Sequence, residues 1–329
     1  MFVCDGSPET RSLLAARPAP WTRAQAFSLS QPERDIWAAI GGGAEAWTAA
    51  GSAPGHDAAL PFWWRVFLVA HAPASQFDAL RDLLAAGLAL PGPVACVALT
   101  GSGFHGQRGR RWVAAPGNLH VTAALCPERF PVRHGIALTM LPAVATVDAI
   151  RAVGGGDVDP RIKWVNDIVF GTAKVAGVLT ATASQGEWLH DAVFGIGLNV
   201  EHAPEVPPTP FTPAIVCLRD ASKSGVFTLS RMLQATLDAM ADRLESVIRG
   251  GPSTLFEVYR KASMIVGRRV RIWEEGMDDL LPPASWPPPI AEGVVEEIGP
   301  DLSLRLEGRA DSIDKGRLAL QEACLGFGI

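Results

Sequence analysis

The sequence predicts an α+β fold in which a mixed sheet packs with helices and a small C-terminal β-barrel follows. Three observations support this prediction. Short strand-like runs between residues 161 and 194 are linked by tight Asn, Asp and Gly turns. Residues 228–248 place one stripe of apolar side chains on a single face, which is typical of an amphipathic helix: Leu229, Leu233, Leu237, Met240, Leu244 and Val247. From Arg268 onward, short strand candidates alternate with turns, and with one more strand they would form a small barrel.

The composition favours a globular protein with a sizeable core. The chain has 329 residues, of which 48% are apolar and 19% are charged, and its formal net charge is −5. A basic excess is the usual footprint of a nucleic-acid-binding protein, so the negative balance argues against that class. A local basic loop on an acidic chain fits a small anionic ligand better.

The cysteines and the apolar runs indicate a cytoplasmic protein that does not enter a membrane. The five cysteines are scattered without metal-ligand spacing, which indicates neither a disulfide framework nor a zinc site. Reduced thiols are typical of the cytosol. No secretory leader is evident at Met1, and the most apolar run, Leu83 to Leu99, is interrupted by two prolines and a glycine.

The first 60 residues contain one clear helix signal. Ser30 is a candidate cap, Pro32 lies in the first turn, and the helix runs from Glu33 to Ile40 before a run of glycines. The pattern is too sparse for a winged helix-turn-helix. This region is either an extension or a part of the main sheet.

Strands and helices alternate through the rest of the chain. Strands are predicted over residues 62–70, 94–99, 118–125, 161–164, 168–170, 176–182, 192–194, 268–273, 290–298, 302–306 and 317–320. Helices are predicted over residues 74–86, 134–153, 228–248 and 253–262, and Pro142 either kinks the second of them or begins its second half. The proline-rich segments 204–213 and 276–289 are predicted as loops, and a domain boundary is expected near Ile265.

One turn region, Phe104 to Trp112, gathers glycines, arginines and a tryptophan between two strand candidates. Glycine lets a backbone approach a ligand closely, and the arginine fork matches phosphate and carboxylate. A tryptophan can lay its flat face over a base. The region is typical of a loop that wraps an anion carrying an aromatic group, although by itself it is also compatible with a basic surface turn.

A second constellation follows in three segments: Lys163 to Asp167, Lys174 to Leu179, and Gly195 to Asn199. Asp167 is a natural ligand for Mg²⁺, which prefers oxygen ligands and usually bridges to substrate phosphates. Each segment alone is compatible with a hairpin turn and solvated lysines. Their combination, in this order after the loop, indicates a site.

Together these motifs resemble those of the biotin protein ligases, within the biotin/lipoate ligase superfamily. The resemblance covers about residues 60 to 322: the Gly/Arg loop with Gly117 to Leu119, then Lys163-Trp-Val-Asn-Asp167, Lys174 to Leu179, and Gly195 to Asn199. Residues from Tyr259 to Leu320 resemble the family's C-terminal SH3-like part. The resemblance implies an N-terminal extension at 1–60, a ligase-like catalytic domain at 61–264 and an SH3-like domain at 265–329.

The resemblance also implies an activity. It implies an ATP- and Mg²⁺-dependent biotin–protein ligase that forms biotinyl-5'-AMP and transfers biotin to a lysine of a biotin carboxyl carrier protein domain, such as that of acetyl-CoA carboxylase. The implied catalytic residues are Lys174, Arg108 and Arg110. The implied substrate-binding residues are Ser75, Gln76, Gly106, Gln107, Gly109, Trp112, Gly177 and Val178. The implied nucleotide-binding residues are Lys163, Asn166, Asp167 and Asn199, with Asp167 also the metal ligand.

The sequence departs from the family pattern at the ligand. His105 and Gln107 replace the first arginines of the family loop, residues 74–76 replace its Ser-Thr-Asn, Gly101 or Ser102 replaces a glutamine, and Val165 replaces a proline. A buried ureido ring without its polar partners would lose about 1–3 kcal/mol per missing hydrogen bond. A lipoate- or octanoate-type ligase or transferase, or a non-catalytic adenylate-binding paralogue, therefore stays an alternative. Pairing of edge strands would allow a homodimer.

Overall fold

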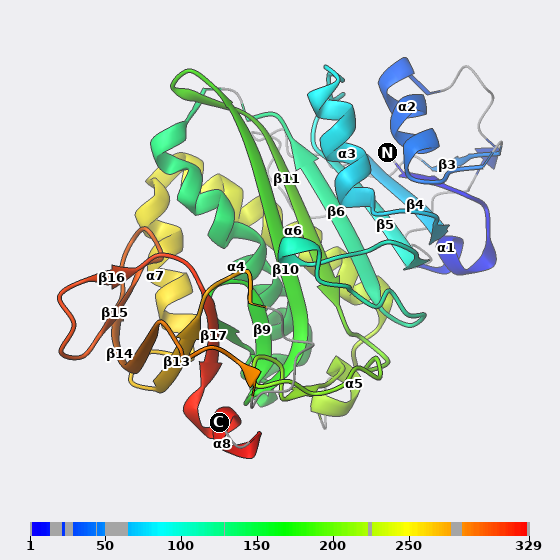
Figure 1. Ribbon diagram of the computed structural model, residues 1–329. Helices are drawn as coiled ribbons and strands as arrows, with labels where there is room; N and C mark the ends of the chain where they lie inside the picture. The colour runs from blue at the N-terminus through cyan, green and yellow to red at the C-terminus, as the bar shows by residue number, and fades with distance from the viewer. Residues whose placement is uncertain are drawn as a thin grey trace.

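A large mixed sheet with helices on both faces forms the body of the molecule, and a smaller antiparallel sheet lies beside it (Figure 1). The computed structural model describes residues 2–13, 22–23, 29–43, 45–49, 65–127, 129–222, 226–277 and 285–327. Within these residues the α+β class predicted from the sequence is confirmed.

Ten strands follow one another across the large sheet. In spatial order they are β2 (Thr22–Arg23), β3 (Trp47–Ala49), β1 (Phe2–Cys4), β4 (Arg65–Ala72), β5 (Val94–Gly101), β6 (Leu119–Leu125), β11 (Trp188–Leu198), β10 (Ala173–Gln185), β9 (Asp167–Phe170) and β8 (Arg161–Lys163). Two short strands, β12 (Ala214–Ile215) and β7 (Phe130–Pro131), pair with β10 and β11. The described N-terminal strands therefore join the main sheet, with β1 parallel to β4.

The loop of glycines and arginines leaves the sheet at a crossover. β4 and β5 are parallel, and the helix α3 (Gln76–Ala85) connects them, as a parallel pair requires. Ser75 caps α3 by accepting a hydrogen bond from the backbone N–H of Asp78 at 3.3 Å. The start of α3 and the end of β5 thereby lie at the same edge of the sheet, where the loop begins.

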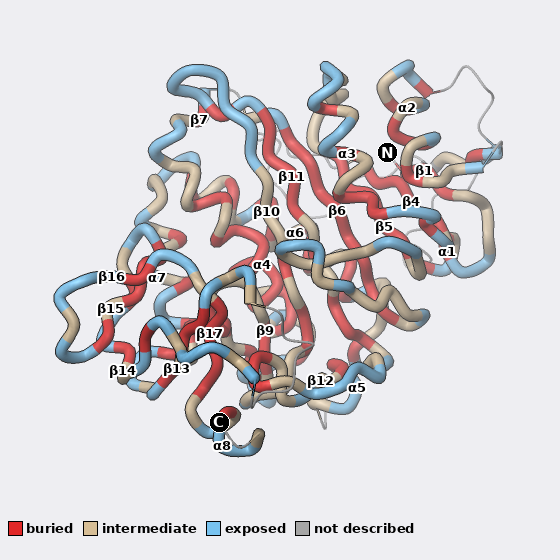
Figure 2. The backbone as a smooth tube through the Cα atoms, in the orientation of Figure 1, coloured by how far each residue is buried: buried red, intermediate tan, exposed pale blue. Residues whose placement is uncertain are grey.

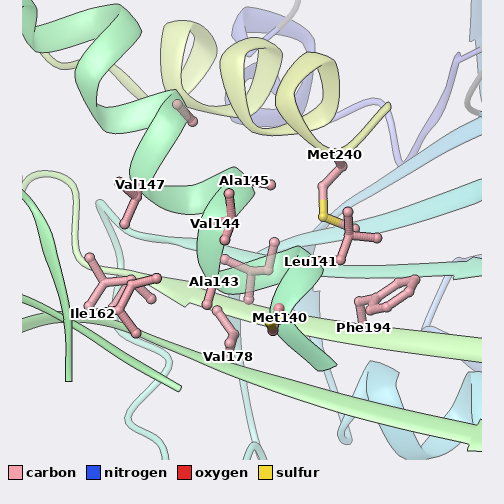
Figure 3. Packing of buried hydrophobic residues seen from close by; sticks show 14 of the residues in the cluster. Met140, Leu141, Ala143, Val144, Ala145, Val147, Ile162, Val178, Phe194 and Met240 are labelled. Carbon is pink, nitrogen blue, oxygen red and sulfur yellow. The ribbon is translucent and has the colours of Figure 1, made fainter. Parts of the chain in front are cut away.

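One face of the sheet is covered by α4 (Gly135–Gly154), with α6 (Leu229–Gly250) and α7 (Pro252–Ala262) packed behind it. α4 is apolar nearly all round, and Pro142 lies inside it without ending it. Met140, Leu141 and Val144 of α4 point into the core formed with Val178 and Phe194 of the sheet (Figure 3). The segment Val132–Asp157 is long and apolar enough to cross a membrane, but 67% of its most apolar window is buried here, as expected of a core helix (Figure 2).

The opposite face carries α3 and α2 (Gln31–Ala39) over a second, smaller core that includes Ile36, Phe67 and Leu80. The predicted start of α2 is confirmed, because Glu33 accepts a hydrogen bond from the backbone N–H of Ser30 at 2.7 Å. A short helix that the sequence did not indicate, α1 (Pro8–Ser12), precedes it.

The C-terminal sheet has five antiparallel strands in the order β16 (Ser312–Ile313), β15 (Leu304–Leu306), β14 (Ala291–Ile298), β13 (Arg269–Trp273) and β17 (Arg317–Leu320). β16 is a fifth strand beyond the four that the sequence predicted. Two short helices, α5 (Leu218–Ala221) and α8 (Gln321–Gly326), were not predicted. Of the predicted loop 276–289, residues 278–284 lie outside the described residues.

The two sheets are joined next to the Lys163–Asp167 segment. The indole N–H of Trp164 donates to the carbonyl of Leu302 at 2.7 Å, and the Tyr259 hydroxyl donates to the carbonyl of Val165 at 2.9 Å. The Trp164–Val165 peptide bond is cis. The turn between β8 and β9 is therefore held by both the helical layer and the C-terminal sheet.

Candidate active site

The loop Phe104–Trp112 is closed by its own backbone. The N–H of Gly106 donates to the carbonyl of Arg110 at 2.7 Å, and the N–H of Trp112 donates to the carbonyl of Phe104 at 2.9 Å. Arg108 and Gly109 form the tip with positive φ angles of 58° and 71°. The exposed guanidinium of Arg108 pairs with Glu275, which follows β13 in the C-terminal sheet.

Trp112 lies against bare strand backbone. Gly177 of β10 and Gly197 of β11 are paired across the two strands. A Cβ atom at Gly197 would come within 2.4 Å of the indole atom Cε2, and one at Gly177 would lie 3.4 Å from Cζ3. The indole N–H donates to Nδ1 of the buried His120 at 3.2 Å. The two glycines thus leave the space that the indole occupies.

Lys174 and Asp167 form an ion pair beside this indole. Lys174 Nζ lies 2.6 Å from Asp167 Oδ1, and each side chain keeps 21% of its surface exposed. The same ammonium lies 5.6 Å from the centre of the Trp112 ring, within the range of a cation–π contact. The loop and the β9–β10 hairpin therefore meet at Trp112 and Lys174.

Three cations surround the single carboxylate of Asp167. Burial acts to raise the pKa of Asp167, but Lys174, Lys163 and Arg110 lower it, and the net direction is downward. Burial lowers the pKa of Lys163 to about 8, against the opposing influence of Asp167. The Lys163 ammonium donates to the carbonyl of Phe211. The surplus of positive charge suits a polyanionic ligand such as a triphosphate.

The two asparagines are engaged in the framework. Asn166 Nδ2 donates to the carbonyl of Val178 at 2.6 Å, while the N–H of Val178 donates back to the Asn166 carbonyl at 3.0 Å. Asn199 Nδ2 donates to the carbonyl of Val216 at 3.4 Å. The buried Oδ1 of Asn199 has no hydrogen-bond partner within the described chain, so it stays available to a ligand or a water molecule.

The start of α3 supplies a second unsatisfied polar group. Gln76 is completely buried, and neither atom of its side-chain amide has a partner among the described residues. Ser75 uses its hydroxyl as the cap of α3. His105 links the loop to this helix, because its Nε2 lies 2.6 Å from Asp78 Oδ2.

The structure brings together five of the residues that the sequence singled out. Lys163, Asp167, Lys174 and Trp112 form one charged and aromatic cluster with Arg110 in electrostatic range. Arg108 lies outside this cluster, since its guanidinium is directed to Glu275. Gly106, Gln107 and Gly109 lie in the loop, and within the described chain the side chain of Gln107 makes no hydrogen bond to the cluster. Within the described parts of the chain no three His, Cys, Asp or Glu side chains are grouped for a metal ion, so Asp167 is a single candidate ligand.

Sequence reasoning missed two residues of the site, Gly197 and His120. Gly197 lies inside a motif that was recognised, but its role under Trp112 was not inferred. A glycine in the interior of a strand is a usable signal, because it often marks a close approach of another group. A histidine on a buried strand carries no comparable signal in the sequence.

Comparison with known proteins places these motifs in a family. Residues 88–199 match the model of the biotin/lipoate A/B protein ligase family. The chain is 34% identical over 100 residues to a biotin–[acetyl-CoA-carboxylase] ligase of Paracoccus denitrificans, which is 30% of this chain and 41% of that protein. It is 26% identical over 224 residues to a ligase of the same name from Mycobacterium tuberculosis, covering 67% of this chain and 78% of the relative. The chain thus spans less than half of the Paracoccus relative.

A solved structure shares the fold. The biotin protein ligase of Aquifex aeolicus in complex with biotin and ATP superposes with a TM-score of 0.60 at 18% sequence identity, covering 78% of this chain and 98% of that one. At that identity the likeness concerns the fold alone. The matched segment 88–199 contains the loop, β9, β10 and β11, and so the whole of the charged cluster. The part of this chain that carries the candidate site therefore matches the biotin/lipoate A/B protein ligase family.

Proposed function

We propose that this protein is an ATP-dependent biotin–protein ligase. The observation that carries the proposal is the cluster of Lys174, Lys163 and Arg110 around Asp167, set beside the indole of Trp112. Joining a carboxylate to an α-phosphate brings two anions together. The step needs fixed cations aimed at the charge that develops, which this cluster supplies.

In the first step, a carboxylate oxygen of biotin attacks the α-phosphorus of ATP, and pyrophosphate leaves. Lys174 would contact both the carboxylate and the α-phosphate, and Arg110 would stabilise the phosphate oxygens. Arg108 would exchange Glu275 for the adenylate. Lys163, Asn166 and Asn199 would lie on the nucleotide side, where the free Oδ1 of Asn199 offers an acceptor.

The acid would lie between α3 and the sheet. Ser75 and Gln76 would line its pocket together with the backbone of Gly177 and Val178. Gly106, Gln107 and Gly109 would cover the adenylate, and Trp112 would pack near the adenine. Asp167 lies among the cations proposed to bind the phosphates, and it would hold the Mg²⁺ ion, which would supply further positive charge. In the second step, a carrier lysine amine attacks the acyl carbon and AMP leaves.

The partner and the cellular setting belong to the same proposal. The acceptor would be a biotin carboxyl carrier protein domain, as the names of the Paracoccus and Mycobacterium relatives suggest. We propose an N-terminal extension at 1–60 whose described strands lengthen the main sheet, a catalytic domain at 61–264 and an SH3-like β-barrel within 265–329, for which the five antiparallel strands are the support. The protein would act in the cytoplasm, away from membranes and nucleic acid, as a monomer or a homodimer.

The decisive experiment combines the protein with ATP, Mg²⁺, biotin and a biotin carboxyl carrier domain. Biotin should appear on the carrier, and Lys174→Ala should abolish both transfer and biotin-dependent release of pyrophosphate. Lys261→Ala, at an exposed position of α7, is the matched control and should act like the native protein. If the native protein neither transfers biotin nor releases pyrophosphate, the proposal is refuted.

A second candidate is a ligase or transferase for a lipoate- or octanoate-type acid. It is favoured by the space next to the loop, where a Cβ atom at Gly101 would meet Phe104 Cε2 at 2.2 Å. The Phe104 ring therefore fills the space that a glutamine side chain at position 101 would take. It makes the surroundings of the loop more apolar at this point. Thermal shifts with biotin, lipoate and octanoate, each with and without ATP, separate the two acids. An acid-dependent pyrophosphate release would dismiss a non-catalytic paralogue.

A further inference from the structure

The contact between His105 and Asp78 has a geometry that fixes the charge of the imidazole. Nε2 of His105 lies 2.6 Å from Asp78 Oδ2, and Nδ1 lies 3.0 Å from the carbonyl oxygen of Gly106. A carboxylate and a carbonyl both accept hydrogen bonds. Both ring nitrogens must therefore donate, which only the doubly protonated imidazolium can do.

Asp78 is itself held in place. Its backbone N–H donates to the Ser75 hydroxyl at the first turn of α3, and its Oδ1 pairs with Arg81 at 3.1 Å. The charged groups of α3 that face His105 are thus Asp78 and Arg81, and across the loop His105 forms a backbone bridge with Arg111. The bonds to Gly106 and Asp78 raise the pKa of His105 above its usual value, against burial and Arg81.

We propose that His105 and Asp78 are positioning residues that clasp the loop Phe104–Trp112 to α3 while His105 is protonated and release it when His105 loses its proton. The clasp lies at the start of the loop, and the loop ends at Trp112 on the Gly177–Gly197 platform. Breaking the contact between His105 and Asp78 would therefore loosen the loop Phe104–Trp112 beside the charged cluster.

The consequence for catalysis rests on the proposed ligase function. An acyl-adenylate is a mixed anhydride that water destroys, so a loop that stays shut protects it until the carrier lysine arrives. Loss of the clasp should let free acid and AMP form without transfer. The closure of the loop itself can be measured without any substrate.

The test is hydrogen exchange of the loop peptide in the full-length protein without ligand, corrected for intrinsic rates, from about pH 6 to about pH 9. Protection should fall about fivefold as His105 deprotonates, the scale of a partly exposed ion pair. Asp78→Asn should lower protection at acidic pH and move the transition to lower pH. His105→Arg carries a permanent charge and should keep protection high across the whole range.

Asp82→Asn is the matched control, because Asp82 lies on the same helix and its side chain is 73% exposed. Within the described chain its carboxylate pairs with Arg81 alone, at 3.4 Å. It should leave loop protection unchanged. Protection in the native protein that does not depend on pH, or an equal loss in Asp82→Asn and Asp78→Asn, would overturn the clasp. If the clasp stands in exchange but no biotin-dependent pyrophosphate forms, the proposed function fails and the clasp does not.

A second readout uses the reaction. In a transfer assay, Asp78→Asn should raise the ratio of pyrophosphate released to biotin transferred by about fivefold. The single variant His105→Arg keeps a positive charge beside Asp78, so its ratio should stay close to that of the native protein. A purely structural role for Asp78 would lower both products together and leave the ratio unchanged, which would contradict the proposal.

Discussion

The indole of Trp112 occupies the space in which a side chain at Gly197 would stand: a Cβ atom there would lie 2.4 Å from both Cε2 and Cζ2. The indole in turn bonds to His120 through its N–H and meets the ammonium of Lys174. A strand glycine therefore determines where the end of the loop rests, and through it how the loop meets the β9–β10 hairpin.

Gly197→Ala should displace Trp112 and damage the site. Overpacking of a close contact costs about 1–3 kcal/mol, and the shifted indole would lose its bond to His120. We expect a lower melting temperature and at least a severalfold loss of biotin-dependent pyrophosphate release. Gly156→Ala is the control, because nothing lies within 4 Å of a Cβ there. Equal behaviour of the two variants would show that Trp112 does not depend on Gly197.

The sequence predicted the helices well where their signals are local. α2 has its capping residues and α6 has one apolar stripe, so both were found close to their bounds. β10 and β11 extend well beyond the predicted runs. The outer end of β10 carries consecutive exposed residues with no alternation, and it is a strand because it pairs with β11. The N-terminal strands were missed because distant groups hold them: Asp5 Oδ2 accepts the backbone N–H of Ala70, 65 residues away.

The same difference between local and distant contacts applies to the residues of the site. Lys174 and Asp167 belong to motifs on neighbouring strands, so their meeting could be expected from the hairpin. The partner of Arg108 could not be expected, because Glu275 is 167 residues away, just after β13 of the other sheet. The clasp between His105 and Asp78 was hidden for a similar reason, although His105 had been recognised as a departure from the family loop.

His120 should make the stability of the protein depend on pH. It is buried, and burial lowers its pKa to about 4, below the usual 6.5. Between these two pH values the unfolded state binds more protons than the folded state, so stability falls as the pH falls through this window. The loss should reach about 3 kcal/mol near pH 4.

His120→Gln should remove much of this loss of stability at acidic pH, while its amide oxygen still offers an acceptor to the indole N–H of Trp112. Denaturant unfolding at several pH values between about 4 and about 7 measures the effect. His190→Gln is the control, because the side chain of His190 is 61% exposed. Parallel stability curves for the native protein and His120→Gln would be inconsistent with a neutral buried imidazole.

Gln76→Leu should separate ligand binding from folding. A buried amide without partners costs free energy in the empty protein, so its removal should leave the melting temperature unchanged or raise it. If the amide recognises the polar head of the acid, biotin affinity should fall about tenfold, on the scale of one or two lost hydrogen bonds. Calorimetry with biotin and with octanoate tests this, and unchanged biotin affinity would place the acid elsewhere.

Phe211→Ala should weaken the site from the side of the C-terminal sheet. The Phe211 ring stacks on Trp286 at 5.1 Å and meets Trp273 edge-on at 5.6 Å, while its carbonyl accepts the ammonium of Lys163. Loss of a buried aromatic ring costs about 3–5 kcal/mol, and the segment that holds Lys163 would loosen. Because Lys163 is proposed to serve the nucleotide, KM for ATP should rise more than kcat falls. Trp188→Ala, an exposed aromatic at the far end of β11, should change neither constant. A loss of kcat alone would show that Phe211 does not act through Lys163.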